Sequence, residues 1–306
     1  MSEAEAGIPP EVRDLLQERE DARAAKDFAA ADRFRERIRD AGFEIADGPS
    51  GPVLEPRAPS GPRVVRPADA PDRLGEPATV DASVHWIVEG WPHDVARGIT
   101  SFDAHAGTRS IQHVVVDVRG TAEAVDEPWP SHAETLRLPE GTGWATGRNA
   151  GLRGSTGAIV MVADGSIEVT GDVLTPLAQA LADPSIGVTG PFGISSPDLH
   201  EFHESPGPDV DAIEGYLMAF PRSLLEDGLC FDEKFRFYRT ADIELSFQVK
   251  ARGLRATVTP LPLRRHEHRM WANTPEEERA RLSKRNFYRF LDRWRGRTDL
   301  LVGDGP

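Results

Sequence analysis

Residues 141–164 read GTGWATGRNAGLRGSTGAIVMVAD and combine a glycine-rich turn, a helical stretch and an apolar strand that ends in an acid. Glycine permits close approach of the backbone to another group. The run 158–163 is short and apolar, with three β-branched residues, which predicts a buried strand. Arg148 can pair with a phosphate, and Asn149 can both donate and accept hydrogen bonds. The stretch therefore predicts a helix followed by a strand, with Asp164 at the carboxyl end of that strand.

The same alternation continues along the chain on both sides of this stretch. Short apolar runs and helical stretches follow one another from about residue 79, which is typical of an α/β domain with a largely parallel sheet. The predicted strands are 83–89, 112–118, 158–163, 186–190, 215–220 and 255–259. The predicted helices are 94–104, 144–154, 171–182, 223–227, 241–253 and 275–294. We expect the last of these helices to lie across the core, because its apolar residues recur at helical spacing.

The first 47 residues have a different pattern. Pro9 and Pro10 suit the first turn of a helix, and Asp27 can cap a second helix whose apolar stripe ends at Gly42. Two short amphipathic helices joined by a tight turn form a hairpin, which we predict for residues 1–47. Such a hairpin buries little apolar area by itself.

A linker is predicted over residues 48–78. Twelve of the thirty residues from Gly48 to Pro77 are Gly or Pro, and this enrichment disfavours both helices and sheet ladders. The sequence is thereby divided into the hairpin, the linker and an α/β domain over residues 79–302.

The charge and the cysteine count restrict the classes of function. The chain has 306 residues, with 36 Lys and Arg against 50 Asp and Glu, and a formal net charge of −14. An acidic surface disfavours a large footprint on nucleic acid or on an anionic membrane. Cys230 has no cysteine partner within the chain, which is typical of a reducing compartment. The first residues lack the order of a signal peptide, and no run approaches the roughly 18 apolar residues of a membrane span. We expect a cytoplasmic, soluble protein.

Three of the predicted strands end in an acidic residue, at Glu89, Asp117 and Asp164. In an open parallel sheet, ligands bind beyond the carboxyl ends of the strands, so we expect these carboxylates to converge on one crevice. The glycines of 141–147 do not follow the G-x-G-x-x-G fingerprint, and no G-x-x-x-x-G-K-[ST] motif occurs. Neither a Rossmann dehydrogenase nor a P-loop nucleotidase is therefore supported.

Two blocks of residues carry a resemblance to a known family. The first is GRNAG at 147–151, followed by a glycine and the strand into Asp164. The second is FDE at 231–233 and ADIEL at 241–245, followed by a glycine, a proline and His266. In this order the blocks resemble the nucleotide-diphospho-sugar glycosyltransferases of family 2, over about residues 79–270. The resemblance implies the GT-A fold, a Rossmann-like and mostly parallel sheet flanked by helices.

The resemblance also implies a binding site for a nucleotide-sugar donor of the UDP or GDP type. Glu89 and Asp117 would lie near the base and ribose, and Arg148 and Asn149 would also face the nucleotide. Asp164 would be the first acid of the D-x-D motif, which holds Mg²⁺ or Mn²⁺ against the diphosphate. Such a cation neutralises the negative charge that develops on the leaving nucleoside diphosphate.

The catalytic residue that the resemblance implies is Asp242. As general base it would take the proton from the acceptor hydroxyl while that hydroxyl attacks the anomeric carbon in line, which inverts that carbon. His266 or His268 would be the late histidine that reaches the metal or the diphosphate. The acceptor itself cannot be identified from the sequence.

Three positions depart from the family pattern. Ser166 replaces the second acid of D-x-D, Ala241 replaces the glutamate of the ED pair, and Gln248 stands where arginine is frequent. A hydroxyl ligates a divalent cation less well than a carboxylate does. Three readings follow: an active transferase with a variant metal site, a metal-independent transferase, and a catalytically degenerate GT-A fold kept for binding or regulation. A nucleotidyltransferase on the same fold is disfavoured, because the first strand runs into EGWP at 89–92 instead of a glycine-rich basic loop.

The N-terminal hairpin has a separate resemblance, over about the first 50 residues. ARAAKDFAAADRFRERI at 22–38 is similar to the C-terminal tail of cysteinyl-tRNA synthetase. The resemblance implies tRNA as a partner for residues 1–47, with Arg23, Lys26 and Arg33 among the side chains that would contact phosphates. Acidic residues interleave with these cations, so a charge-balanced hairpin that docks on a protein partner is the favoured alternative.

Overall fold

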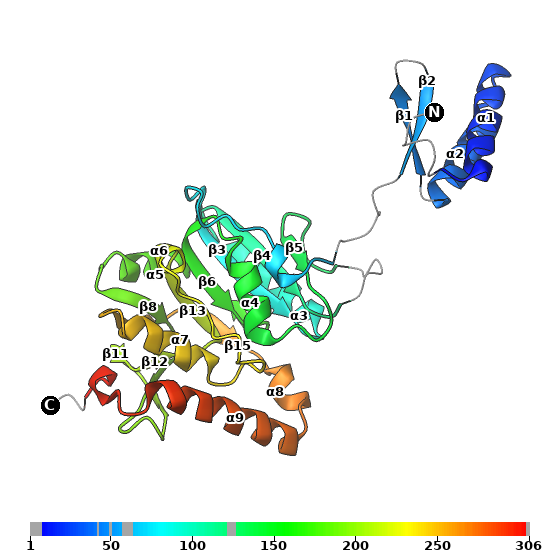
Figure 1. Ribbon diagram of the computed structural model, residues 1–306. Coiled ribbons are helices and arrows are strands. Elements are labelled where there is room, and N and C mark those ends of the chain that lie inside the picture. The colour runs from blue at the N-terminus through cyan, green and yellow to red at the C-terminus, as the bar shows by residue number, and fades with distance from the viewer. Residues whose placement is uncertain (1–7, 42, 49–50, 57–63, 121–126, 304–306) are drawn as a thin grey trace. The chain divides into compact units, whose positions relative to one another are not determined.

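The chain forms two compact units, residues 1–63 and residues 64–306. The structure is a computed structural model that describes residues 8–41, 43–48, 51–56, 64–120 and 127–303. Each unit is described by itself below, with the element labels of Figure 1. No helix in these described ranges is long and apolar enough to cross a bilayer.

The first unit begins with the predicted helical hairpin, which is confirmed. Helix α1 spans Pro10–Ala24 and α2 spans Phe28–Asp40. Asp27 caps α2, since its Oδ1 accepts a hydrogen bond of 3.0 Å from the N–H of Ala30. The turn between the helices places Lys26 at a φ of 60°. Helix packing buries Ile38 completely.

The structure differs from the predicted linker of residues 48–78. Strands β1 (Phe43–Gly48) and β2 (Gly51–Pro56) pair in antiparallel register directly after the helices. Prolines are tolerated in β2 because each strand of a two-stranded ladder keeps one edge that needs no donor. Gly42, the expected stop of α2, and residues 49–50 and 57–63 lie outside the described residues.

The second half of the predicted linker is part of the second unit. Val65 donates its N–H to the carbonyl of Arg137 at 2.9 Å, and Arg73 donates to the carbonyl of Arg153 at 2.8 Å. A short 3₁₀ turn at Pro67–Asp69 lies between these contacts. The α/β unit therefore begins near Val64 and not at residue 79.

The second unit is a mixed α/β domain around an eight-stranded sheet, in the order β11-β14-β8-β13-β6-β3-β4-β5. The strands of this sheet are β3 (Val80–Val88), β4 (Ile111–Asp117), β5 (Glu134–Arg137), β6 (Gly157–Ala163), β8 (Ile186–Gly190), β11 (Asp209–Val210), β13 (Leu217–Pro221) and β14 (Arg255–Val258). The smaller strands are β7 (Ile167–Val169), β9 (Gly193–Ser195), β10 (His203–Ser205), β12 (Ala212–Ile213) and β15 (Leu263–Arg265). The predicted α/β class with a mostly parallel sheet is confirmed; β13 is the central exception, because it runs antiparallel to both β6 and β8.

Helices cover both faces of the sheet (Figure 1). They are α3 (Pro92–His105), α4 (Trp144–Leu152), α5 (Leu174–Leu181), α6 (Ser223–Glu226), α7 (Ala241–Lys250), α8 (Arg269–Asn273) and α9 (Glu276–Trp294), with a 3₁₀ turn at Thr298–Leu300. One buried cluster holds the apolar residues of α3 and α5 against the sheet. A second cluster holds those of α4, α6, α7 and α9 against the other face. The near-continuous burial of β3, β4 and β6 follows from this cover on both sides.

The last long helix, α9, packs on α7 as expected. Phe290 is fully buried, and its ring meets Phe247 of α7 edge-on with 5.0 Å between the centroids. A second edge contact, at 5.7 Å, joins Phe290 to Phe202. Asn286, one turn earlier on α9, donates hydrogen bonds to the carbonyls of Phe237 and Arg239 at 2.7 and 2.8 Å. Helix α9 thereby fixes the loop that leads into α7.

Phe290→Ala is expected to destabilise the protein by about 3–5 kcal/mol, because it opens a cavity between α7 and α9. The matched control on the same helix is Tyr288→Ala, whose side chain is exposed and whose loss should cost under about 1 kcal/mol. Urea unfolding followed by circular dichroism measures both free energies. Equal destabilisation by the two variants would contradict the packing of α9.

Candidate active site

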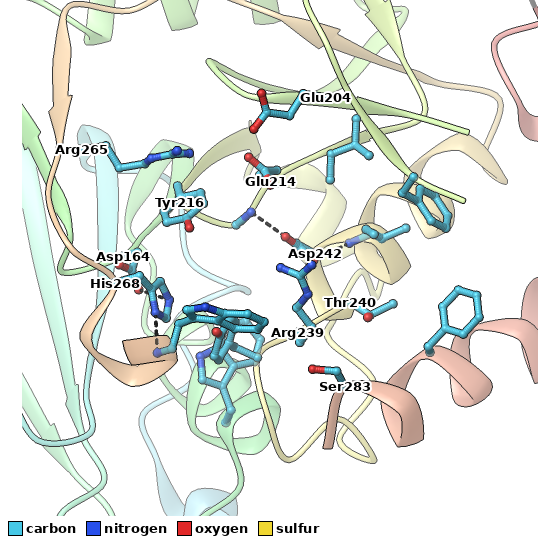
Figure 2. Close-up of a pocket in the computed structure, with 18 of the residues that line it drawn as sticks. Asp164, Glu204, Glu214, Tyr216, Arg239, Thr240, Asp242, Arg265, His268 and Ser283 are labelled. Atoms are coloured by element: carbon cyan, nitrogen blue, oxygen red, sulfur yellow. Dashed lines mark hydrogen bonds and ion pairs between the residues drawn. The ribbon is translucent and has the colours of Figure 1, made fainter. Parts of the chain in front are cut away.

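One cavity of about 1000 Å³ lies at the ends of β3 and β6 and extends to α7, α8 and α9. Six of the eight residues that the sequence predicted for the site line it: Glu89, Arg148, Asp164, Asp242, His266 and His268. Of these, His266 is turned toward another partner, as described below. Figure 2 shows the side chains at the centre of this cavity. Because the lining comes from strand ends and from the start of α7, the cavity occupies the crevice that an α/β sheet offers to a ligand.

Asp164 follows β6 directly, and both of its carboxylate oxygens have hydrogen-bonding partners. The N–H and the hydroxyl of Ser166 both donate to Oδ1. Oδ2 lies 3.4 Å from Nε2 of His268. Ser166 is buried at 3% exposure, so its hydroxyl serves to orient Asp164 instead of facing the cavity.

His268 is held from three sides. Its ring lies 4.6 Å from the ring of Tyr238 and 5.7 Å from that of Tyr216. Its Nδ1 accepts a hydrogen bond of 3.1 Å from the N–H of Trp271 and so caps α8. In the neutral ring the proton therefore sits on Nε2, which points at Asp164.

His266, two residues earlier, is turned toward a different partner. Its Nε2 lies 2.6 Å from a carboxylate oxygen of Glu168. This bond lowers the pKa of the Glu168 carboxyl. The prediction that His266 serves as a metal ligand beside Asp164 is not supported by this geometry, because Glu168 occupies its Nε2.

Asp242 stands in the first turn of α7, and its carboxylate is held by backbone groups. Oδ2 accepts from the N–H of Gly215 at 2.8 Å, and Oδ1 accepts from the N–H of Ile243 at 2.9 Å. A Cβ at position 215 would lie 3.3 Å from the Cβ of Asp242, so only glycine allows this approach without displacement. Burial raises the pKa of Asp242 above its usual value, while the two N–H groups and the positive charge of Arg239 oppose the rise.

Arg148 is buried at 1% exposure beneath the cavity. Its guanidinium donates to the carbonyl of His85 at 2.8 Å and to that of Ala163 at 3.0 Å. The Trp144 ring lies 5.2 Å from the guanidinium carbon. Burial lowers the pKa of Arg148 to about 10, and the carboxylate of Asp164 counteracts this. The residue is a fixed cation beneath the cavity, and not a flexible arm.

Glu89, the residue after β3, shares this environment. Burial raises its pKa to about 7, and the negative charge of Asp164 adds to the rise. Arg148 acts in the opposite direction. The carboxyl of Glu89 therefore changes its charge near neutral pH.

Asn149 and Asp117 are not among the residues that line the cavity. The amide of Asn149 donates to the carbonyl of Phe231 at 2.8 Å and accepts from the N–H of the same residue at 2.9 Å. Asp117 is 1% exposed and bonds the guanidinium of Arg119 at 2.7 Å. The prediction that both face the nucleotide differs from this geometry, in which their polar groups are used to fix neighbouring loops.

A second group of possible metal ligands consists of Asp103, His113 and His132, on the α3 side of the sheet. Asp103 lies 3.2 Å from Nε2 of His113 and 3.1 Å from Nε2 of His132. The indole N–H of Trp86 donates to Nδ1 of His113 at 3.1 Å. This bond places the ring proton on Nε2, which faces Asp103. The three side chains form a hydrogen-bonded network here, and His113 would have to move its ring proton to Nδ1 before Nε2 could ligate a cation.

Sequence reasoning missed two charged residues that line the cavity, Glu214 and Arg239. Glu214 precedes the glycine that contacts Asp242, and burial raises its pKa to about 7, with the charge of Asp242 as the second cause. The position of Arg239 in the sequence, three residues before the predicted base Asp242, could have indicated a place at the site. Nothing in the sequence around Glu214 separates it from a surface acid.

Comparison with known proteins gives two separate matches along the chain. The family described as Glycosyl transferase family 2 matches residues 117–244, which include Asp164 and Asp242. The resemblance to this glycosyltransferase family is confirmed. The family described as Cysteinyl-tRNA ligase anticodon binding domain matches residues 5–51.

A solved structure supports the fold of the second unit. The crystal structure of GalNAc-T7 with UDP, GalNAc and Mn²⁺ superposes with a TM-score of 0.57 at 16% identity, over 72% of this chain and 49% of that one. At this identity the similarity establishes the GT-A fold alone. The mannosyltransferase PcManGT from Pyrobaculum calidifontis, in complex with GDP-Man and Mn²⁺, has a TM-score of 0.47 at 19% identity, over 72% of this chain and 69% of that one.

Cysteine–tRNA ligases are among the curated relatives, and they match a short part of this chain. The cysteine–tRNA ligase of Pectobacterium carotovorum subsp. carotovorum (strain PC1) is 49% identical over 43 residues, which are 14% of this chain and 9% of the ligase. That of Salmonella arizonae is 46% identical over 50 residues, 16% of this chain and 11% of the ligase. The chain thus spans about a tenth of the length of these ligases. The resemblance of the N-terminal hairpin to the ligase tail is confirmed.

The raised pKa of Glu214 predicts a pH-dependent cost to the stability of the glycosyltransferase-like unit. Between pH 4.5 and 7 the unfolded chain releases the Glu214 proton while the folded protein retains it, so stability falls with rising pH over this window and the loss persists above it. Glu214→Gln is neutral at every pH and should stabilise the protein by about 1–2 kcal/mol at pH 8 but not at pH 4.5.

Thermal or urea unfolding at the two pH values measures this difference. The matched control is Glu204→Gln, which removes an exposed acid that lines the same cavity. A gain at pH 8 that is equal in the two variants would show that net charge, and not the burial of Glu214, is the cause.

Proposed function

We propose that the second unit transfers a sugar from a nucleotide-diphosphate donor of the UDP or GDP type to an acceptor hydroxyl, with inversion at the anomeric carbon. The observation that carries this proposal is that Asp164 and Asp242 line one cavity and both lie within the segment that matches family 2. One acid is available for the leaving diphosphate and the other for the attacking hydroxyl. Mixed charge along the cavity suits a ligand that bears phosphates.

Donor binding is assigned to the end of the cavity formed by Glu89, Arg148 and Asp164. Arg148 is a buried cation next to both carboxylates, and its positive potential attracts a phosphate at the cavity floor. Glu89 titrates near neutral pH and in its protonated form can donate to a donor hydroxyl or phosphate oxygen. The solved GT-A relative that carries UDP, GalNAc and Mn²⁺ supports a nucleotide-sugar donor for this fold.

A divalent cation, Mg²⁺ or Mn²⁺, fits at Asp164 and His268. Oδ2 and Nε2 are 3.4 Å apart, so both can lie about 2.1 Å from one ion. When bound, the ion would neutralise charge on the departing diphosphate. His268 would ligate after its proton moves from Nε2 to Nδ1, and this displaces the N–H of Trp271 that now bonds Nδ1. Ser166 and His266 are occupied elsewhere and contribute no ligand in this arrangement.

Asp242 is assigned as the general base. Its raised pKa makes it a better proton acceptor than an exposed aspartate. The N–H groups of Gly215 and Ile243 hold the carboxylate in one orientation, which sets the direction from which the acceptor hydroxyl attacks. Arg239 stabilises the ionised form from a distance.

The first experiment is calorimetric titration with UDP, GDP and their sugar conjugates, with and without Mn²⁺. We expect one nucleotide to bind at least 10-fold more tightly with Mn²⁺ than without it, and Asp164→Ala to remove this difference. Asp172→Ala, an exposed acid outside the cavity, is the matched control. Nucleotide binding that is independent of metal and unchanged in Asp164→Ala would contradict the assignment of a metal ligand to Asp164. If no nucleotide binds, the result would support the alternative of a catalytically degenerate GT-A fold kept for binding or regulation.

Asp242→Asn tests the base. The change keeps the shape of the side chain and one of its two backbone hydrogen bonds, because the amide oxygen can accept from only one of the N–H groups of Gly215 and Ile243. It removes the proton affinity, so sugar transfer should fall about 10²–10⁴-fold while the nucleotide Kd changes less than about 3-fold. Asp292→Asn, on the exposed face of α9, should retain full turnover. Unchanged turnover in Asp242→Asn would show that another group takes the proton.

A partner for the first unit is proposed separately. The match of residues 5–51 to an anticodon-binding domain favours tRNA, whereas the acids among its basic residues favour a protein. Binding to tRNA that weakens steeply with added salt would support tRNA as the partner.

A cytoplasmic location is proposed for the chain, because its single cysteine is typical of a reducing compartment.

A further inference from the structure

The wall that α8 and α9 contribute to the cavity differs in charge from the rest of the lining. Its residues are Trp271, Ala272, Ser283, Lys284 and Phe287. This wall has one cation and no acid, although acids line the cavity at the ends of β3 and β6 and beside β12. Arg239, in the loop before α7, adds a second cation where the wall meets Asp242.

These cations have no carboxylate partner of their own. Within the described part of the chain, neither Arg239 nor Lys284 forms an ion pair, whereas Arg293 of the same helix pairs with Glu244 at 2.6 Å. The guanidinium of Arg239 instead lies over the Trp271 ring at 5.2 Å, and Arg279 lies 4.2 Å from the same ring. Among the described residues neither of these two arginines has a carboxylate within ion-pair distance, and the charge of Arg239 acts on Asp242 only from farther away. An anionic ligand would supply the missing charge.

A buried hydroxyl accompanies them. The Oγ of Ser283 is shielded from solvent and has no hydrogen-bonding partner among the described residues. It is a neighbour of Lys284 on α9 and lines the same cavity. A buried polar atom without a partner costs free energy, which a bound oxyanion that accepts its proton would recover.

The location separates this group from the donor end. In the view of Figure 2, Thr240 and Ser283 lie below Asp242, whereas Asp164 lies to its left. A cavity of about 1000 Å³ is at the upper limit for a single small ligand, so it has room for a donor and an acceptor together. A ligand at the α8–α9 wall would be next to the base and away from the diphosphate.

We propose that the acceptor is anionic and that Arg239, Lys284 and the Ser283 hydroxyl bind its phosphate or carboxylate group, so that its hydroxyl is presented to Asp242. This rests on the proposed function, because it names the class of acceptor for the same site. Arg239 acts on both the anion and the base, because its charge stabilises ionised Asp242 and attracts the acceptor. A bidentate guanidinium suits both phosphate and carboxylate.

The test measures binding directly, so that it does not depend on finding the natural acceptor. Glucose 6-phosphate, glucuronate and glucose are titrated into the full-length protein by calorimetry, with and without the nucleotide that binds best. We expect the phosphate or the carboxylate probe to bind at least 10-fold more tightly than glucose. The tighter of the two identifies the anionic group.

Variants locate the binding. Lys284→Gln should lower the affinity for the preferred anionic probe at least 10-fold, and Arg239→Gln should lower it by a similar factor. Arg285→Gln, the exposed cation next along α9, is the matched control and should leave the affinity unchanged. Equal binding of all three probes, or equal loss in Lys284→Gln and Arg285→Gln, would overturn the proposal.

The nucleotide titration separates this inference from the proposed function. If a nucleotide binds and the anionic probes show no preference over glucose, the acceptor assignment alone fails. If no nucleotide binds but an anionic probe does, and Lys284→Gln abolishes it, the anion site stands and sugar transfer does not.

Discussion

The buried guanidinium of Arg148 is the interaction on which the cavity depends. It ties α4 to the carbonyls of His85 in β3 and Ala163 in β6, the two strands whose ends carry the acids. A buried cation requires negative charge nearby, and Glu89 and Asp164 provide it. The two acids therefore help to stabilise the carboxyl ends of β3 and β6, in addition to any chemical role in the cavity. This explains how two carboxylates can remain in a cavity that is partly closed to water.

Hydrogen bonds from the chain then orient the acids in different ways. Asp164 is held by Ser166 and faces His268, whereas Asp242 is held only by backbone N–H groups. Neutral backbone donors fix the position of a carboxylate without adding a full positive charge, so burial can still raise the pKa of Asp242. In the proposed function, Asp164 would therefore face a cation and Asp242 would accept a proton.

Much of the fold could be predicted because it depends on local patterns. Six strands of the eight-stranded sheet, and all the described α-helices except α8, followed from apolar runs and helical spacing, and the cap at Asp27 followed from capping chemistry. The structure differs from the predicted linker at β2, which pairs with the adjacent β1 despite its prolines. The antiparallel direction of β13 was not predicted, because it depends on the neighbouring strands and not on the residues of β13 themselves.

The site could be predicted only as far as the family motifs reach. Asp164, Arg148 and Asp242 stand in recognisable blocks, and the cavity brings them together. Asn149 stands in the same block, but it bonds Phe231, and spacing could not reveal that its amide spans a tertiary contact. Glu214 and Trp271 reach the cavity from the loop after β12 and from a short helix, neither of which carries a motif. Their roles arise from burial and stacking, which the sequence does not encode locally.

Ser166 shows why a departure from the family pattern need not remove the site. An acid at this position would put a second negative charge beside Asp164, and without a cation the two would repel each other. The serine donates to Asp164 instead, so the carboxylate is ordered before any ligand arrives. The cost is one metal ligand fewer. In the proposed cation site His268 would supply a further ligand, and it would give up its bond to the N–H of Trp271 for this role. Donor binding at Asp164 would then be linked to the position of α8 through a single imidazole ring.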